Sequence, residues 1–351
     1  MSAKSRLHIA MVAPPRFENP PRSYGGGVKV MMDDLARSLL RLGHQVTLIG
    51  AGRSGTSPHV LAAYTEPPSH PLDEPAPRAA VPDVRPADLD VDVVHDHSPA
   101  GSVTALNPRI PTVTTVHGPA SGEQAERYRR LGDSVGLVST STFQRMQAPD
   151  LNWLGTVHNG VDLKSFPFRE RKEDYALFLG RFTPGKGAHL AIDAARRAGR
   201  RIVLAGRLNE PSEHEYFDSH IRPRLGDDAV YVGEADGPRK RELLADAHCL
   251  LFPSRREEAF GMVMIEAMAS GTPVVALRGG AVGEVLVDGI TGYVCDDPAD
   301  LAEAVEAAGG LNPADCRMHV KRNFDALGMA MGYEKIYELS IRDRRPAPYA
   351  A

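Results

Sequence analysis

The segment YALFLGRFTPGKG, residues 175–187, is the stretch from which the fold prediction starts. Its apolar run predicts a β-strand, and the proline and glycines after it predict a tight loop leading into a helix that ends near Gly199. The first half of the chain opens in the same way, with the strand-like run LHIAMVA (7–13), the glycine loop YGGG (24–27) and helical apolar spacing over residues 28–43. This repeated order predicts two α/β units, each with a parallel sheet.

Further apolar runs alternate with helical patterns in both halves. In the first half they cover residues 45–51, 91–97, 111–118, 136–141 and 155–160, and in the second half they read RRIVLAGR, AVYVGE, CLLFPS, PVVAL and TGYVC. Residues 52–90 hold eight prolines and little periodicity, which predicts a long connection on the surface. Ligands bind beyond the carboxyl ends of parallel strands, so two such halves predict an interdomain cleft.

Composition predicts a soluble two-domain protein in a reducing compartment, which we expect to be the cytoplasm. The 351 residues are 42% hydrophobic and 25% charged, and the net charge of −4 argues against nucleic-acid binding. Cys249, Cys295 and Cys316 are widely spaced and predict no disulfide or zinc site. No apolar stretch approaches the roughly 18 residues of a membrane span, so any membrane contact is expected to be peripheral.

Basic residues in the glycine loop of the second half are candidates for anion binding. In GRFTPGKG, Arg181 and Lys186 flank a Pro-Gly turn and can point toward one anion, although the spacing is not that of a P-loop. The other basic clusters, ERYRR (126–130), residues 168–172 and PRKR (238–241), are interpreted as solvated surface.

The segment EEAFGMVMIE, residues 257–266, carries two carboxylates around an apolar run. On one continuous helix they would share a face poorly, so a helix starting near Gly261 is predicted, with Glu258 before it and Glu266 about one turn inside it. The free amides of a helix start attract phosphate, and carboxylates accept hydrogen bonds from sugar hydroxyls. A glycosidase pair would use the same two acids but would leave the glycine loops and bases without a function.

Histidines mark the ends of two strands in the first half. His117 follows PTVTTV and is a candidate for substrate contact, with a purely structural histidine as the alternative. In VHDH, His95 and His97 share one strand face and Asp96 takes the other, which falls short of the three or four convergent ligands of zinc. No acidic residue ends the strand QVTLIGAG, which argues against a dinucleotide-dependent dehydrogenase.

Together these motifs resemble a known family. YGGG, VVHDH, TTVHG, HNGVD, LFLGRFTPGKG, EEAFGMVMIEAMASGTPVVA and EVLVDGITGYV are similar to segments of the retaining nucleotide-sugar glycosyltransferases of family four, which have the GT-B fold. The resemblance covers about residues 7–341 and extends to a compact bacterial subgroup that includes enzymes decorating antibiotics. It implies an acceptor-side Rossmann-like domain at 1–163, a nucleotide-sugar-binding Rossmann-like domain at 164–326 and a C-terminal helix, 327–351, that returns to the first domain.

The resemblance also implies a function for each candidate residue. Arg181 and Lys186 would bind the donor diphosphate, Glu258 the sugar hydroxyls and Glu266 the ribose hydroxyls. His117 would approach the donor sugar. Backbone contacts to sugar and phosphate would come from Gly26, Gly27, Phe260, Gly261 and Met262.

The implied reaction moves a hexosyl group from a nucleotide sugar, with a UDP-sugar expected, to the hydroxyl of a small-molecule, glycan or lipid-linked acceptor. Retention is thought to proceed by front-face attack, and the bases and the helix dipole replace a catalytic metal, so no metal or cofactor is expected. An epimerase, a phosphorylase- or synthase-type enzyme and a non-catalytic nucleotide-sugar-binding protein are the alternatives. The sequence does not give the oligomeric state.

Overall fold

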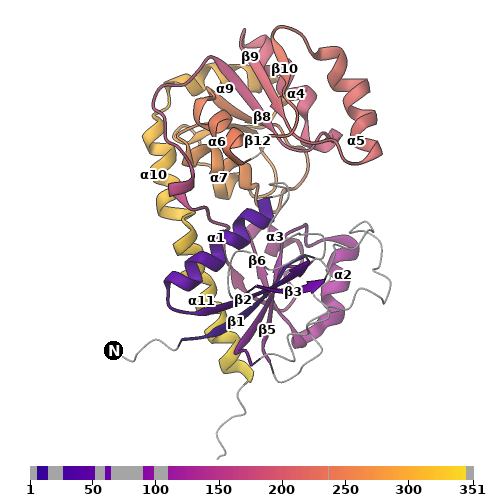
Figure 1. Cartoon of the computed structure of the whole chain (residues 1–351). Helices are drawn as coiled ribbons and strands as arrows, with labels where there is room; N and C mark the ends of the chain where they lie inside the picture. Colours follow the sequence, from indigo (N-terminus) through magenta and orange to yellow (C-terminus); the bar gives the residue numbers. More distant parts are fainter. Residues whose placement is uncertain are drawn as a thin grey trace, which may run out of the picture. The chain divides into compact units, whose positions relative to one another are not determined.

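A computed structural model describes residues 6–14, 27–51, 60–64, 90–98, 110–235 and 237–344 of the chain. The chain divides into two compact units, the first formed by Met1–His158 with Ala326–Ala351 and the second by Asn159–Asp325. Each unit holds one sheet, and all strand pairs in both sheets are parallel. The prediction of two α/β units is confirmed (Figure 1).

The sheet of the first unit has the strand order β3-β2-β1-β4-β5-β6-β7. The inner strand β1 buries Ile9, Ala10 and Met11 completely, as expected for a parallel strand covered on both faces. From β1 the chain first builds the sheet toward β3 and then starts again on the other side with β4. The strands are β1 (His8–Val12), β2 (Gln45–Ala51), β3 (Val60–Tyr64), β4 (Val93–Asp96), β5 (Thr112–Val116), β6 (Gly136–Ser139) and β7 (Trp153–Thr156).

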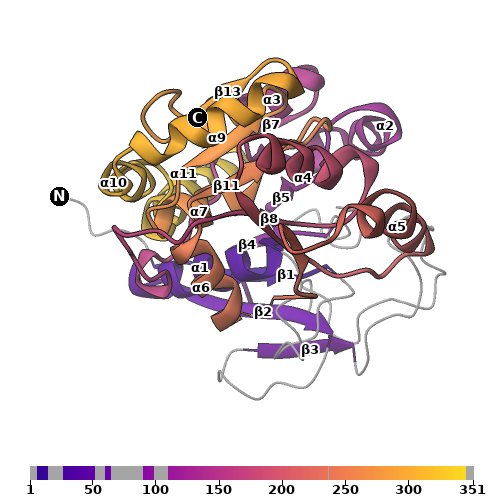
Figure 2. The same cartoon turned by 90° about the horizontal axis from the view of Figure 1, so that it is seen from above.

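Two predictions for this sheet were wrong. The segment 52–90 is not only a connection, because β3 lies within it. This strand pairs with β2 and forms one edge of the sheet (Figure 2). The five apolar residues of β3 are too few to show a period among so many prolines. The strand predicted at 155–160 is instead β7, which begins at Trp153 and ends at Thr156.

Helices α1 (Gly27–Arg41), α2 (Gly122–Leu131), α3 (Thr142–Gln147) and α11 (Ala326–Arg344) belong to the first unit. Helix α1 buries Met31, Leu35 and Leu39, in the spacing that the sequence predicts. Helix α11 comes from the far end of the chain and packs against α1, β5 and β7 (Figure 1).

The sheet of the second unit has the order β10-β9-β8-β11-β12-β13. Its strands are β8 (Tyr175–Leu179), β9 (Arg201–Ala205), β10 (Ala229–Tyr231), β11 (Cys249–Phe252), β12 (Val274–Leu277) and β13 (Gly292–Cys295). Its helices are α4 (Ala188–Arg197), α5 (Pro211–Tyr216), α6 (Gly237–Asp246), α7 (Met262–Ala269), α8 (Val282–Val285), α9 (Leu301–Ala307) and α10 (Pro313–Asn323).

The direction of strand order reverses once in each sheet, between β1 and β4 and between β8 and β11. At such a reversal the connections leave to opposite sides and open a crevice beyond the carboxyl ends of the two strands, where open α/β sheets bind ligands. The loops that follow these four strands are therefore where a site is expected in each unit.

A buried polar network fastens α11 to the first sheet. His95 Nδ1 lies 2.7 Å from the Tyr337 hydroxyl oxygen, and His95 Nε2 lies 2.7 Å from Thr115 Oγ1. Thr115 Oγ1 in turn lies 2.8 Å from the Tyr333 hydroxyl oxygen. All four side chains are buried. Burial, with a smaller contribution from His117, lowers the pKa of His95 to about 3, so this imidazole is neutral at physiological pH.

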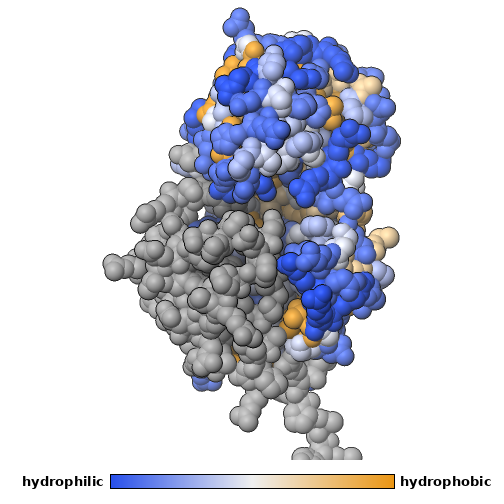
Figure 3. Space-filling model, turned by 90° about the vertical axis from the view of Figure 1, so that its right-hand side faces the viewer, coloured by the Kyte–Doolittle hydropathy of each residue, from blue (hydrophilic) through white to orange (hydrophobic). Residues whose placement is uncertain are grey.

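The described surface of the second unit is mostly hydrophilic on the face drawn in Figure 3. Within the described ranges, no helix is both long enough and apolar enough to cross a membrane.

The glycine loop after β8 gives a stability prediction. Gly187 has φ +70, and a Cβ there would lie 2.3 Å from the Pro253 carbonyl oxygen, whereas Gly199 has φ +62 and nothing within 4 Å. Gly199→Ala should lower the free energy of unfolding by about 1–2 kcal/mol, which is the cost of placing alanine in the left-handed conformation. Gly187→Ala should cost roughly 1–3 kcal/mol more because of the clash. Urea unfolding followed by circular dichroism measures both, and equal losses would contradict this account.

The histidines of the first unit give a pH prediction. Because burial lowers their pKa values, to about 3 for His95 and about 4 for His117, the unfolded chain binds more protons below pH 6.5. Above that pH neither state binds these protons, and the free energy of unfolding keeps its full value. As pH drops toward 4, the free energy of unfolding should fall by about 1.4 kcal/mol per pH unit for each proton that the unfolded chain takes up. Melting temperatures across this range test the prediction. In His95→Gln, which cannot take up the proton, the decline should be shallower; an identical slope would refute the assignment.

Candidate functional site

The loops that follow β8 and β11 are locked to each other at the strand-order reversal of the second sheet. The Arg255 backbone N–H donates to the Gly185 carbonyl over 2.8 Å, and Ser254 Oγ lies 3.3 Å from the same carbonyl oxygen. Residues Pro184–Lys186 form a single 3₁₀ turn that ends at Gly187. The absence of a side chain at Gly187 lets this turn lie directly against the Pro253 carbonyl.

This contact places Lys186 beside Glu258. Lys186 Nζ lies 2.6 Å from Glu258 Oε1, and Ser254 Oγ donates to the same oxygen over 3.0 Å. Both side chains are about four-fifths buried, with 24% and 19% exposed, and the Phe252 ring centre lies 5.8 Å from Nζ. The ammonium group is thus held in one position, and only one of its three N–H donors is needed for Glu258.

The helix start predicted near Gly261 is confirmed. Helix α7 begins at Met262, and Gly261 takes φ +88, a left-handed conformation that favours glycine. Phe260 is buried, whereas Gly261 and Met262 are partly exposed. The start of a helix carries partial positive charge, so the chain brings a second source of positive potential to the loop that carries Glu258.

Gly280 supports the backbone of Glu258 from the other side. It has φ +52, and a Cβ there would lie 2.5 Å from Glu258 N and 2.4 Å from Glu258 O. The next residue, Ala281, donates its N–H to the Glu258 carbonyl over 3.0 Å. Gly280 was not among the residues predicted from the sequence, although the Gly-Gly pair before α8 was a visible signal of a tight turn.

Arg181 has a carboxylate partner of its own. Its Nε donates to Glu213 Oε1 over 2.5 Å, and Glu213 also accepts from the backbone N–H groups of Asn209 and Glu210. Burial opposes ionisation of Glu213, but these hydrogen bonds outweigh it and lower its pKa below the ordinary value. Arg181 itself is 55% exposed. The structure therefore pairs Arg181 and Lys186 with different carboxylates.

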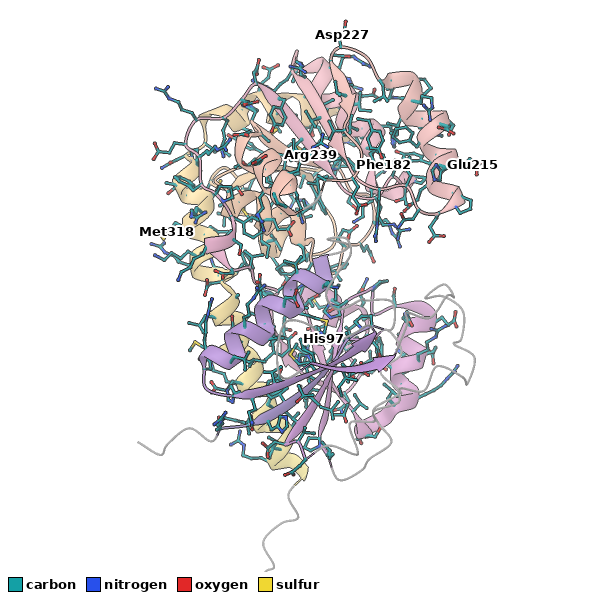
Figure 4. The ribbon with its side chains drawn as sticks, in the orientation of Figure 1. His97, Phe182, Glu215, Asp227, Arg239 and Met318 are labelled. Atoms are coloured by element: carbon teal, nitrogen blue, oxygen red, sulfur yellow. The ribbon has the colours of Figure 1, made fainter. Side chains whose placement is uncertain are left out.

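Glu266 is paired rather than open to a ligand. It lies about one turn inside α7, as predicted, but it is buried and its carboxylate oxygens lie 2.6–2.7 Å from Lys240 Nζ. The interpretation of PRKR (238–241) as solvated surface was wrong for Lys240, which is only 21% exposed. Its neighbour Arg239 is labelled on α6 in Figure 4. Any ribose contact of Glu266 has to share this carboxylate with the lysine.

The histidines of the first unit gather at the ends of β4 and β5. His97 Nδ1 and His117 Nε2 lie 3.0 Å apart, and the His95 and His97 ring centres are separated by 3.9 Å. Figure 4 labels His97 inside the first unit. His97 is buried and His117 is partly buried. Burial lowers the pKa of His117 to about 4 and, with the neighbouring histidines, that of His97 well below its ordinary value.

The glycine loop of the first unit is described only at its end. Gly27 is the first residue of α1 and is partly buried, whereas Gly26 lies outside the described residues. In the part of the chain that the structure describes, no three His, Cys, Asp or Glu side chains come together in a way that could hold a metal ion.

Three residues of this site were not predicted as site residues. They are Glu213, Ser254 at the end of the run CLLFPS, and Lys240 within PRKR, and each is linked to a predicted residue only through the fold.

Comparison with known proteins agrees with this geometry. The family described as Glycosyl transferases group 1 matches residues 162–314, and Glycosyltransferase Family 4 matches residues 25–165. A glycogen synthase of Mycobacterium tuberculosis is 28% identical over 299 residues, covering 73% of this chain and 71% of the relative.

Two solved structures share the fold over almost the whole chain. AviGT4, a glycosyltransferase involved in avilamycin A biosynthesis, has a TM-score of 0.74 and 27% identity, with 96% of this chain and 98% of that chain covered. Anabaena HepE in complex with UDP-glucose has a TM-score of 0.72 and 18% identity, with 95% and 99% covered. The chain is therefore a glycosyltransferase with the GT-B fold of two Rossmann-like units, and its two halves match the models of group 1 and of family 4.

Proposed function

We propose that the protein transfers a hexosyl group, with retention of configuration, from a UDP-sugar to an acceptor hydroxyl. The second unit holds the nucleotide sugar at the reversal between β8 and β11. The observation that carries this proposal is the position of Lys186, fixed 2.6 Å from Glu258 in the loop that leads to α7. A cation and a helix start on adjacent loops suit a diphosphate, and a carboxylate beside them suits sugar hydroxyls.

Each residue then has a defined part in the transfer. Lys186 and Arg181 stabilise the negative charge that grows on the diphosphate as the bond to the sugar breaks. The backbone of Phe260, Gly261 and Met262 faces the sugar and phosphate, and Glu258 accepts hydrogen bonds from the sugar. Glu266 holds the ribose together with Lys240. Gly26 and Gly27 contact phosphate, and His117 contacts the donor sugar.

The same residues make a metal unnecessary in the proposed reaction, because the bases and the helix dipole supply the positive charge. A UDP donor is supported by the likeness to HepE, whose structure was solved with UDP-glucose. The acceptor hydroxyl attacks the anomeric carbon, the bond to the phosphate oxygen breaks, and the acceptor proton passes to the departing phosphate.

A thermal-shift screen against UDP-, GDP-, ADP- and dTDP-sugars tests the proposal. A ligand present at 100 times its Kd stabilises the folded protein by about 2.7 kcal/mol, so the correct donor should raise the melting temperature clearly. Turnover of that donor should release nucleoside diphosphate and persist in EDTA. Stabilisation only by ligands that lack phosphate would overturn the proposal.

Lys186→Ala should lower turnover of the donor by at least about 100-fold, since loss of one group that stabilises transition-state charge costs roughly 3 kcal/mol or more. Release of nucleoside diphosphate measures this effect. Lys164→Ala is the matched control, because Lys164 is exposed and belongs to the same unit. Equal turnover in the two variants would remove Lys186 from the mechanism.

Glu258→Ala should impair sugar placement more than nucleotide binding. We expect turnover to fall roughly 100-fold while affinity for UDP alone, measured by calorimetry, changes little, because the carboxylate is assigned to the sugar hydroxyls. A large gain in UDP affinity would instead show that Glu258 mainly neutralises Lys186, and a parallel loss of UDP affinity would show that it holds the nucleotide.

A further inference from the structure

The hydrogen bond between His97 and His117 joins the ends of two adjacent strands. His97 follows β4 and His117 follows β5, and these strands pair in parallel with Asp96 opposite Thr114. His97 Nδ1 and His117 Nε2 lie 3.0 Å apart, and the two rings are tilted by only 21°. Because an imidazole N–H and lone pair lie in the ring plane, nearly parallel rings suit a direct hydrogen bond.

This bond holds one proton. Burial keeps both imidazoles neutral at physiological pH, and a neutral imidazole has one N–H donor and one acceptor nitrogen. Either His97 donates from Nδ1 to His117 Nε2, or His117 donates from Nε2 to His97 Nδ1. The choice decides what His117 offers through its other nitrogen, Nδ1: an N–H donor in the first case and a lone pair in the second.

The remaining nitrogen of His97 separates the two cases. His97 Nε2 is buried and has no hydrogen-bond partner among the described residues. If His117 donated, this nitrogen would carry an N–H group buried without an acceptor. If His97 donates, it carries only a lone pair. Buried N–H groups without partners are rarer in folded proteins than acceptors without partners, so donation by His97 is favoured.

His95 packs against the His97 ring. Its ring centre lies 3.9 Å from that of His97, and its own two nitrogens are taken by the hydroxyl groups of Tyr337 and Thr115. His95 is therefore a buried histidine on the same strand that supports His97 by packing and has its hydrogen bonds elsewhere.

We propose that His97 is a positioning residue that fixes His117 as the tautomer protonated on Nδ1. His117 then presents an N–H donor to an oxygen of its ligand and has no lone pair with which to act as a general base. The identity of that oxygen as part of a nucleotide sugar rests on the proposed function. The tautomer itself does not.

The tautomer can be read without a substrate. In protein labelled with ¹⁵N-histidine, the nitrogen shifts of His117, assigned by comparison with His117→Gln, should show a protonated Nδ1 and a bare Nε2 at pH 7.5. His97→Asn places a carboxamide N–H near the former Nδ1 and should retain this tautomer. The leucine of His97→Leu cannot donate a hydrogen bond, so His117 should no longer be held in this tautomer. In His95→Gln, His117 should keep the Nδ1-protonated tautomer.

Turnover should follow the tautomer. His97→Leu should lose about 100-fold in kcat with little change in donor KM, as for loss of one aimed hydrogen-bond donor, and His97→Asn should recover most of the loss. A His117 protonated on Nε2 in the unmodified protein, or equal losses in His97→Asn and His97→Leu, would overturn the inference. If His97→Leu does not fold, the spectra of the unmodified protein and His97→Asn still decide. A protein with the expected tautomer that turns over no nucleotide sugar would overturn only the proposed function.

Discussion

The hydrogen bond from the Arg255 backbone to the Gly185 carbonyl is the contact on which the second unit's site depends. It joins the loop after β8 to the loop after β11, the two strands between which the strand order reverses. It can form only because Gly187 has no side chain to meet the Pro253 carbonyl. Lys186 and Glu258 lie on opposite sides of this joint, so their ion pair is a consequence of backbone packing.

Each cation of the site is paired with a carboxylate that is more buried than itself. Breaking such a pair leaves a buried charge without compensation, so the pairs hold the cationic groups in place before any ligand arrives. Transition-state stabilisation by fixed charges requires this kind of preorganisation. The pairs are Lys186 with Glu258, Arg181 with Glu213 and Lys240 with Glu266.

The two units offer different chemistry to a ligand. The second unit supplies cations and a helix start, whereas the first unit supplies imidazoles that burial keeps neutral. Adjacent imidazoles with little access to water cannot readily be charged together, so in the proposed reaction His117 would contribute a directed hydrogen bond and little charge. Cations suit a diphosphate, and a neutral donor suits an uncharged sugar oxygen. The place of His117 after a strand was predictable from the sequence, but its hydrogen bond with His97 was not.

Local periodicity and the backbone freedom of glycine were enough to predict the alternation of strands and helices, the glycine turn after β8 and the start of α7. It did not reveal β3, whose apolar run is short and lies among prolines. The pairing of charged and polar side chains, in contrast, follows from how the chain is folded. Arg181 and Glu213 are 32 positions apart, Lys240 and Glu266 are 26 apart, and His97 and His117 are 20 apart. Which residues become partners depends on the order of the strands in the sheet, and local sequence patterns do not predict that order.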